Sequence, residues 1–384
     1  MDRSFAFSVP TNVQFGWGAS QAVVSALPPE TKSVALLRGK QAQGAHSIRQ
    51  ALDRYAVSRV EVICSGEPSF ASVNAAVNQL GQHKIEAVIA VGGGSVIDAG
   101  KVVAFCLGRR LALGSDFSEV PTALLSKAAP IPSIAIPTTA GTGAEVTANA
   151  VLDIPERQAK VSLRGRALFP SAALVDPDLL KSAPDSVLLY SGLDAVVQTI
   201  EAYTSCAATP FSDALTEPNI TLGIKALQQI MAGNAPDRAW QDMAWVSLTS
   251  GMALANGGLG AAHGIASILG GRYAAPHGAL CGRLLAPVLR KNLEVAADGT
   301  MAAKRLSACL SHIHAGFGKV PHGDDLSGLE DWQERHVLPR LRTLGVQQED
   351  IQSIAEASAT ASSSKKNAVA LTPHDFADIL RRAL

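Results

Sequence analysis

Short apolar runs rich in β-branched residues alternate with helix-like stretches through the first half of the chain. The short runs predict strands, and the amphipathic stretches between them predict helices. Apolar strands that alternate with helices are typical of a parallel sheet covered by helices on both faces. The predicted strands cover residues 33–37, 60–64, 87–91 and 131–136, and the predicted helices cover residues 45–55, 72–82 and 98–106.

This alternation ends near residue 178, in the segment Val175-Asp176-Pro177-Asp178-Leu179. The Ala/Leu-rich stretches beyond it predict an all-helical bundle. Pro218 suits the first position of a helix, because no backbone N–H is needed there. We therefore expect an α/β domain over residues 1–178 and a helical domain over residues 179–384. The predicted helices cover residues 188–204, 218–231, 239–255, 301–317, 329–344, 350–361 and 373–384.

The composition is that of a globular protein, since 47% of the residues are hydrophobic and 17% are charged. Lys plus Arg and Asp plus Glu number 33 each, without a basic run, so bulk charge attracts neither nucleic acid nor an acidic membrane surface. Residues 243–271 lack charged side chains and are long enough for a bilayer span. Their glycines, with Asn256 and His263, fit closely packed helices in a soluble protein better, so no membrane partner is expected.

The cysteines are scattered singly along the chain, and their number is odd. This pattern predicts neither a disulfide framework nor a structural zinc site. Reduced thiols are typical of cytosolic proteins, and the first residues lack the pattern of a signal peptide, so a cytoplasmic location is expected. The five thiols belong to Cys64, Cys106, Cys206, Cys281 and Cys309.

A glycine loop follows the third predicted strand and opens the helix that carries Asp98. Its residues Gly92, Gly93 and Gly94, followed by Ser95, remove every Cβ where the backbone must turn sharply. Backbone N–H groups can then approach an anion such as a pyrophosphate at the positive end of the helix. A tight turn without any ligand explains the same letters, and the loop is not the usual GxGxxG fingerprint.

A second loop, which begins at Pro137, also follows a predicted strand. Thr138, Thr139 and Thr142 place three hydroxyl groups at the same edge of the sheet as the glycine loop. Two such loops side by side form a crevice in which a dinucleotide could lie. Threonine-rich turns are common, but two of them in register with strand ends favour a cofactor site.

Asp194, Gln198, His263 and His277 are the candidate metal ligands. Asp194 and Gln198 are four residues apart, so on a helix their side chains share one face. Carboxylate and imidazole groups suit a divalent metal such as iron or zinc, which can act as a Lewis acid toward an oxygen-bearing substrate. The alternative is that both histidines are hydrogen-bonded polar groups packed in a helical core.

Taken together, these segments resemble the iron-containing, group III alcohol dehydrogenases, which include glycerol dehydrogenase and maleylacetate reductase. The resemblance covers nearly the whole chain in the right order. The matching segments are Gly92-Gly93-Gly94-Ser95-Val96-Ile97-Asp98, Pro137-Thr138-Thr139-Ala140-Gly141-Thr142-Gly143, Gly192-Leu193-Asp194-Ala195 with Glu201-Ala202-Tyr203, His263-Gly264 and Pro276-His277-Gly278.

The resemblance implies a dehydroquinate-synthase-like architecture: a Rossmann-like NAD(P)-binding domain, a helical metal domain and an active-site cleft between them. It also implies a homodimer. The family's metal ligands would be Asp194, Gln198, His263 and His277, with the two histidines at the catalytic centre. Its cofactor contacts would be Gly39, Gly92, Gly93, Gly94, Ser95, Asp98, Thr138, Thr139, Thr142 and Lys160, of which Lys160 would reach the nicotinamide ribose.

Two departures from the family pattern change what we expect. Gly39 stands where NAD-preferring members often carry Asp, and Arg38 and Lys40 flank it. A carboxylate would repel a 2′-phosphate, whereas these cations could attract one or simply face solvent, so we expect NADPH to be accepted. Gln198 stands where a histidine ligand is expected, and its amide oxygen is a weaker donor for Fe²⁺ or Zn²⁺. The metal site is therefore expected to be weakened.

The resulting hypothesis is an NAD(P)-dependent oxidoreductase that transfers a hydride between a nicotinamide and the carbonyl or alcohol carbon of a small alcohol, aldehyde or keto acid. The main alternative is a metal-independent reductase like maleylacetate reductase, in which His263 and His277 donate hydrogen bonds or carry protons. A non-catalytic nucleotide-binding descendant and a dehydroquinate-synthase-like lyase also stay open. A keto acid would need cations such as Arg272, Arg283, Lys365 or Lys366 to face the site.

Overall fold

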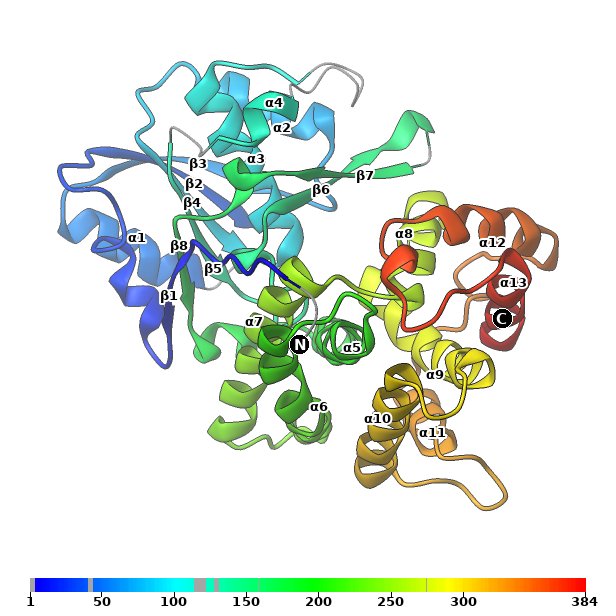
Figure 1. Ribbon diagram of the computed structural model, residues 1–384. Helices are drawn as coiled ribbons and strands as arrows, with labels where there is room; N and C mark the ends of the chain where they lie inside the picture. Colours follow the sequence, from blue (N-terminus) through cyan, green and yellow to red (C-terminus); the bar gives the residue numbers. More distant parts are fainter. Residues whose placement is uncertain (1–3, 41–43, 114–121, 128–130, 158, 274) are drawn as a thin grey trace. The chain divides into compact units, whose positions relative to one another are not determined.

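The computed structural model describes residues 4–40, 44–113, 122–127, 131–157, 159–273 and 275–384 (Figure 1). These residues form two compact units. One unit comprises residues 9–184, and the other comprises residues 4–8 together with residues 185–384. The predicted domain boundary falls inside η6, a short 3-10 helix over Pro177–Ser182.

The first unit is built on a six-stranded sheet, and every neighbouring pair of strands in it is parallel. The spatial order is β1-β8-β5-β4-β2-β3, which confirms the predicted parallel sheet. The glycine loop leaves β4, and the threonine loop leaves its neighbour β5. The strands are β1 (Asn12–Phe15), β2 (Ser33–Gly39), β3 (Ser58–Cys64), β4 (Ala87–Gly92), β5 (Ser133–Pro137) and β8 (Ala172–Val175).

Helices cover both faces of this sheet, as the apolar strands predict (Figure 1). Leu37 of β2 packs in a cluster with α2 and α3, whereas the adjacent Leu36 packs in a second cluster with α1. Successive side chains of a strand point to opposite faces, so a strand buried on both sides is apolar throughout. The helices are α1 (Gly44–Arg54), α2 (Phe70–Leu80), α3 (Gly94–Arg109) and the short α4 (Thr122–Leu125).

A two-stranded antiparallel sheet, β6 (Asn149–Ile154) and β7 (Ala159–Arg164), also belongs to this unit and was not predicted. Every second residue of β6 is buried, which is the alternation of a strand with one covered face. The four-residue strands β1 and β8 were likewise too short to stand out in the sequence. The short 3-10 helices of the described chain are η1 (Ala19–Val23), η3 (Ala144–Val146), η4 (Pro155–Arg157), η5 (Arg166–Leu168), η6, η7 (Gln348–Asp350) and η8 (Ser364–Lys366).

The second unit is helical throughout its described residues, as predicted. Its central helix, α5, packs against α6, α7 and α9. The helices are α5 (Asp185–Thr204), α6 (Pro210–Met231), α7 (Asp237–Gly257), α8 (Ala261–Tyr273), α9 (His277–Val295), α10 (Met301–Phe317), α11 (Ser327–Arg335), α12 (Ile351–Thr360) and α13 (Pro373–Ala383).

Two helix predictions were wrong in detail. Pro218 does not begin a helix: α6 begins at Pro210, and Pro218 lies in its interior. Thr209 and Ser212 form a capping box there, which is a stronger start signal than a proline alone. The helix predicted over residues 329–344 ends at Arg335, and Val337 adopts a left-handed conformation with φ 56°. Closely packed helices were expected over residues 243–271, but the bounds of α8 were not predicted, because glycine weakens helix propensity.

No single helix among the described residues is long and apolar enough to cross a bilayer. The helices α7 and α8 meet the length and composition test only as a pair, and they are bent by 97° at the break between them.

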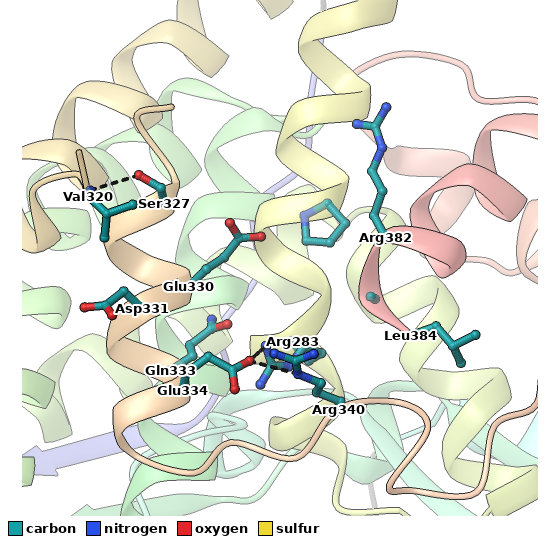
Figure 2. A pocket seen from close by; sticks show the side chains of 12 residues that line it. Arg283, Val320, Ser327, Glu330, Asp331, Gln333, Glu334, Arg340, Arg382 and Leu384 are labelled. Atoms are coloured by element: carbon teal, nitrogen blue, oxygen red, sulfur yellow. Dashed lines mark hydrogen bonds and ion pairs between the residues drawn. The ribbon is translucent and has the colours of Figure 1, made fainter. Parts of the chain in front are cut away.

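The helical unit contains a cavity of about 420 Å³ beside α9, α11 and α13 (Figure 2). Its charged lining is largely paired internally. Arg283 donates to Glu334 Oε1 at 2.9 Å, and Arg340 donates to the same oxygen at 3.2 Å. Arg382 forms an ion pair with Glu294 at 2.7 Å. These charges hold helices together, so the cavity offers no unpaired cation for an acidic substrate among these three arginines.

Candidate metal centre and nucleotide loops

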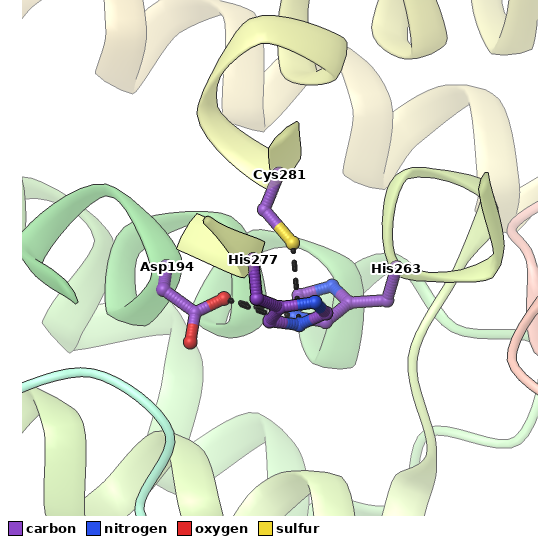
Figure 3. A group of neighbouring side chains, drawn as sticks. All are labelled: Asp194, His263, His277 and Cys281. Atoms are coloured by element: carbon purple, nitrogen blue, oxygen red, sulfur yellow. Dashed lines mark hydrogen bonds and ion pairs between the residues drawn. The ribbon is translucent and has the colours of Figure 1, made fainter. Parts of the chain in front are cut away.

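Four ligand-type side chains of the helical unit converge: Asp194 from α5, His263 from α8, and His277 and Cys281 from α9 (Figure 3). One oxygen, two ring nitrogens and one sulfur all lie within 4.8 Å of one another. Asp194 Oδ1 is 3.4 Å from His263 Nε2 and 3.8 Å from His277 Nε2. Cys281 Sγ is 3.6 Å from His277 Nε2. The structure therefore brings together three of the four predicted ligands and adds a thiol.

Local sequence explains why α9 reaches this point. The helix begins at His277, directly after Pro276, so its first side chain lies at the helix end. Gly278 follows, and a Cβ at this position would overlap the backbone carbonyl of Tyr190 in α5 and come within 3.2 Å of Asp194 Cβ. The missing side chain lets α9 approach α5 closely. Cys281 lies one turn after His277 and therefore shares its face.

Glu201 orients His263. This buried carboxylate lies on α5 and accepts hydrogen bonds from the backbone N–H groups of Gly260, Ala262 and His263. Its Oε2 is also 2.7 Å from His263 Nδ1. Because a carboxylate accepts, Nδ1 carries the proton in this pair, and Nε2 presents its lone pair to Asp194. The sequence contained Glu201 in a matching segment, but nothing in the pattern indicated this role.

Two buried atoms of the cluster lack a hydrogen-bond partner among the described residues, namely Asp194 Oδ1 and His263 Nε2. Both are acceptors when the imidazole is neutral, and they face each other at 3.4 Å. Buried polar atoms are almost always paired, so two facing acceptors call for a positive partner between them, which is either a proton on Nε2 or a bound cation. Carboxylate, imidazole and thiolate are ligands for zinc and iron, so these residues fit a divalent cation.

The pKa shifts describe the same electrostatic field. Burial alone would raise the pKa of Asp194. The interaction with the His263 ring and the charge of His277 outweigh burial, so the pKa is lowered. Burial alone lowers the pKa of His263, but Cys281, Asp194 and Glu201 raise it well above its ordinary range. The pKa of His277 is raised as well, against burial, by Cys281 and Asp194. The site therefore favours positive charge.

Gln198, the fourth predicted ligand, is buried one turn after Asp194. Its Nε2 donates to Ser250 Oγ of α7 at 2.7 Å, and that hydroxyl donates to the carbonyl of Ser247 at 2.9 Å. The amide orientation is therefore set by α7. The role of Gln198 as a ligand stays a prediction.

Cys281 was missed by the sequence reasoning, which treated all five cysteines alike as buried reduced thiols. Cys281 is indeed a buried free thiol. A usable signal was present, because a cysteine four residues after a candidate ligand must share its helical face. The spacing of His277 and Cys281 carried that information.

In the α/β unit the two predicted loops adjoin. The backbone N–H of Thr138 donates to the carbonyl of Gly92 at 2.9 Å. A Cβ on Gly93 would lie 3.3 Å from Thr139 Oγ1, and one on Gly94 would lie 2.7 Å from Thr142 Oγ1. The glycines thus let the two loops lie close together at the start of α3, which begins without a side-chain cap. Backbone N–H groups at such a helix start can bind a pyrophosphate.

Ser95 lies in the first turn of α3 and also lines a small cavity of about 90 Å³. Asp98 is buried one turn later and holds the unit together. It pairs with Lys101 Nζ at 3.0 Å and accepts from the N–H of Val151 in β6 at 2.9 Å. Lys160 lies in β7, and its Nζ is 3.5 Å from Glu67 Oε2. Contacts of Asp98 and Lys160 with a cofactor remain predictions.

At the end of β2, Arg38 forms an ion pair with Glu61 at 3.0 Å. Glu61 also pairs with Arg49 and Arg59, and these hydrogen bonds, with Arg49 first, lower its pKa to about 2 despite partial burial. Three guanidinium groups thus surround one carboxylate, although Asp53 pairs with Arg59 as well. The three arginines outnumber the two carboxylates, so the group carries a net positive charge near Gly39, at the end of β2.

The cations proposed to recognise an acidic substrate do not gather at the metal cluster. Arg272 is exposed and donates to Ser353 Oγ at 2.8 Å, and Lys365 and Lys366 are exposed. Arg283 is engaged by Glu334 and by backbone carbonyls. The positions of these four cations therefore do not support a keto acid as the substrate.

Comparison with known proteins identifies the family to which the two units of the chain are similar. The model of the N-terminal domain of iron-containing alcohol dehydrogenases matches residues 10–177, and the model of the C-terminal domain matches residues 188–384. Alcohol dehydrogenase 4 of Saccharomyces cerevisiae is 30% identical over 82% of this chain and 80% of its own length. The NAD-dependent methanol dehydrogenase of Bacillus methanolicus is 29% identical over 83% of this chain and 82% of its own.

Solved structures show the same fold over the full length. A 1,3-propanediol oxidoreductase matches with a TM-score of 0.85 and 25% identity, covering 100% of both chains. An iron-containing alcohol dehydrogenase from Thermotoga maritima matches with a TM-score of 0.81 and 25% identity, covering 99% of both chains.

Proposed function

The chain belongs to the iron-containing alcohol dehydrogenase family, and we propose that this oxidoreductase interconverts small alcohols and their carbonyl forms with a divalent cation at Asp194, His263 and His277. One observation carries the cation: Asp194 Oδ1 and His263 Nε2 are buried, face each other and have no hydrogen-bond partner among the described residues. A nicotinamide supplies or accepts the hydride, and a divalent cation polarises the substrate oxygen.

The protein's own residues position and desolvate these groups. Asp194 and the two imidazole Nε2 atoms form the cation-binding face, and Glu201 holds His263 in the tautomer that leaves Nε2 free to bind. His277 is the most exposed of the four clustered side chains. Its Nδ1 lies on the ring edge away from Nε2, and we propose that this atom exchanges protons with solvent. The glycine and threonine loops supply backbone N–H and hydroxyl groups for the pyrophosphate.

For the cofactor we propose NADPH, with NADH as the weaker alternative. The positive surplus around Glu61 and the absence of a carboxylate at Gly39 support this choice. Gly39 has an ordinary φ, and a Cβ there would meet nothing within 4 Å, so an aspartate fits without strain. Gly39→Asp should shift the ratio of kcat/KM toward NADH by at least about tenfold, or about 1.4 kcal/mol, whereas Gly39→Ala should not. Equal ratios for both variants and the wild type would contradict the proposal.

For the substrate we propose a small neutral alcohol or aldehyde. Relatives named for methanol, 1-propanol and 1,3-propanediol support this class. The paired or exposed state of Arg272, Arg283, Lys365 and Lys366 favours it over a keto acid.

The test is NADPH consumption with small aldehydes, followed in the chelated protein and after return of zinc or iron. We expect activity to vanish on chelation and to return with the cation. Asp194→Asn and His263→Ala should abolish both the recovery and the stoichiometric binding of the cation. Full activity in the metal-free protein would instead support the metal-independent reductase, and tight nucleotide binding without turnover would support the non-catalytic descendant.

A homodimer and a cytoplasmic location complete the proposal. The single, unpaired cysteines of the described chain suit a reducing compartment. Light scattering after size-exclusion chromatography tests the dimer, and cell fractionation tests the location.

A further inference from the structure

Cys281 lies one turn after His277 on α9, and its Sγ is one of the four ligand atoms within 4.8 Å of one another (Figure 3). We propose that the Cys281 thiolate binds the cation directly, beside Asp194, His263 and His277, and that this sulfur makes the site selective for zinc. The inference rests on the cation-dependent function proposed above and specifies one further ligand for it.

The spacing of the ligand atoms fits one small cation. Zinc binds nitrogen and oxygen at about 2.0–2.2 Å and sulfur at about 2.3 Å, so tetrahedral neighbours lie about 3.3–3.6 Å apart. Asp194 Oδ1 is 3.4 Å from His263 Nε2 and 3.8 Å from His277 Nε2, and Cys281 Sγ is 3.6 Å from His277 Nε2. These three separations are within a few tenths of an ångström of that range, and all four ligand atoms lie within 4.8 Å of one another, so small side-chain shifts would bring the thiol into the shell of one cation.

Charge balance favours the thiolate as well. Asp194 and His263 are almost fully buried, and an uncompensated charge is costly there. Among the groups that would bind directly, one carboxylate alone would leave a divalent cation with one excess positive charge, whereas a carboxylate and a thiolate neutralise it. Glu201, 2.7 Å from His263 Nδ1, adds a further negative charge behind the site. Binding breaks the S–H bond of Cys281 and forms a sulfur–metal bond, and the proton leaves to water.

Gln198 cannot supply what Cys281 supplies. Its amide is neutral and a weak donor, and its Nε2 is held by Ser250 of α7 at 2.7 Å. A thiolate is both anionic and soft, which favours zinc over magnesium, calcium or manganese. We infer that the position of the thiol on α9 compensates for the amide on α5.

The first experiment uses Co²⁺ as a zinc analogue in the full-length protein, because cobalt bound to a thiolate shows a sulfur charge-transfer band in the near ultraviolet. The wild type and Cys309→Ala should show this band, and Cys281→Ala should lack it. Cys309 is the matched control, since it is a buried free thiol of the same unit on α10. A band of full intensity in Cys281→Ala, or no band in the wild type although cobalt binds, would overturn the proposal.

The second experiment measures zinc affinity by competition with a chelator. Outer partners of metal sites typically contribute 10–100-fold, so loss of a direct ligand in Cys281→Ala should weaken zinc binding by about 100-fold or more. Cys309→Ala should bind as the wild type does. An affinity within about threefold of the wild type for Cys281→Ala would contradict a direct bond.

A third variant separates coordination from packing. Gln198→His replaces the weakly donating amide with an imidazole that can bind zinc. In this background, Cys281→Ala should therefore reduce zinc affinity much less than it does in the wild type. A merely structural cysteine would cost the same in both backgrounds, which would overturn the proposal. Failure of the proposed function looks different: zinc binding would then be insensitive to Asp194→Asn. Sensitivity to Asp194 without sensitivity to Cys281 would refute only the thiolate.

Discussion

At the scale of single residues, the cation site depends on a side chain that does not touch it. Glu201 accepts from three backbone N–H groups and from His263 Nδ1, and so fixes which ring nitrogen faces Asp194. Carboxylate–histidine pairs of this kind raise ligand basicity and hold the ring in place.

We therefore predict that Glu201→Gln weakens zinc binding by about 10–100-fold. The amide of glutamine would present donors to the N–H groups that now share a carboxylate, and His263 would lose its tautomer constraint. Chelator competition on protein with an unchanged circular dichroism spectrum measures the effect. Glu217→Gln, at an exposed position of α6, removes the same charge and should leave zinc affinity unchanged. Equal affinities for the two variants would exclude a positioning role.

Glu145 provides a pH prediction in the other unit. Burial raises its pKa from 4.5 to about 7, although its own backbone hydrogen bond and the charge of Lys101 act against this shift. Between these values the folded state holds a proton that the unfolded state has released. Stability should therefore fall as pH rises from about 4.5 to about 7, by on the order of 3 kcal/mol.

Glu145→Gln should remove this dependence, because glutamine does not ionise. Urea denaturation at about pH 5 and about pH 8 measures it: the wild type should lose more stability between the two values than the variant does. Parallel changes in the two proteins would show that Glu145 is already ionised when folded.

The residues also show where sequence reasoning stops. Asp194, His263 and His277 could be identified from ligand type and family motifs, and the structure brings them together. Cys281 could have been identified from its spacing to His277, but its approach to Asp194 depends on the close contact of α9 with α5. The role of Glu201 depends on the turn before α8, which is a tertiary contact that no local pattern encodes.

At the scale of elements, predictions succeeded where the apolar period was strong. The buried strands β2, β4 and β5 and the long helix α10 lie where the pattern placed them. The failures have different causes: β1 and β8 have only four residues, and glycines needed for close packing obscured the bounds of α8. Helix starts were misplaced where a capping box, and not the apolar period, decided the boundary, as in α6.

The glycine loop between β4 and α3 yields a prediction at this scale. A Cβ on Gly94 would lie 2.7 Å from Thr142 Oγ1, so in Gly94→Ala the Thr142 side chain or its loop must shift. We expect NADPH affinity to fall by at least about tenfold, as measured by fluorescence titration. Zinc affinity should not change, because the cation residues belong to the other unit. Gly39→Ala, which meets nothing within 4 Å, is the control, and equal loss in both variants would place the effect outside the loop contact.

At the scale of the whole molecule, the two binding functions are divided between two compact units. The candidate nucleotide loops belong to residues 9–184, and the four clustered ligands belong to the unit that contains residues 185–384. The balanced charge of 33 basic and 33 acidic residues gives the chain as a whole no bulk attraction for a polyanion. Specificity must therefore come from these local sites.

Because the candidate pyrophosphate loops lie in one unit and the candidate cation ligands in the other, we predict that each ligand mainly stabilises the unit that holds those residues. A ligand present at 100 times its Kd adds about 2.7 kcal/mol to the state that binds it. Zinc should slow proteolysis within residues 185–384, and NADPH should slow it within residues 9–184, with the protected fragments identified by mass spectrometry. Asp194→Asn should remove only the zinc effect, and Gly94→Ala should reduce only the NADPH effect. If either ligand protected both units equally in both variants, the sites would be energetically coupled, and the assignment of one ligand to each unit would fail.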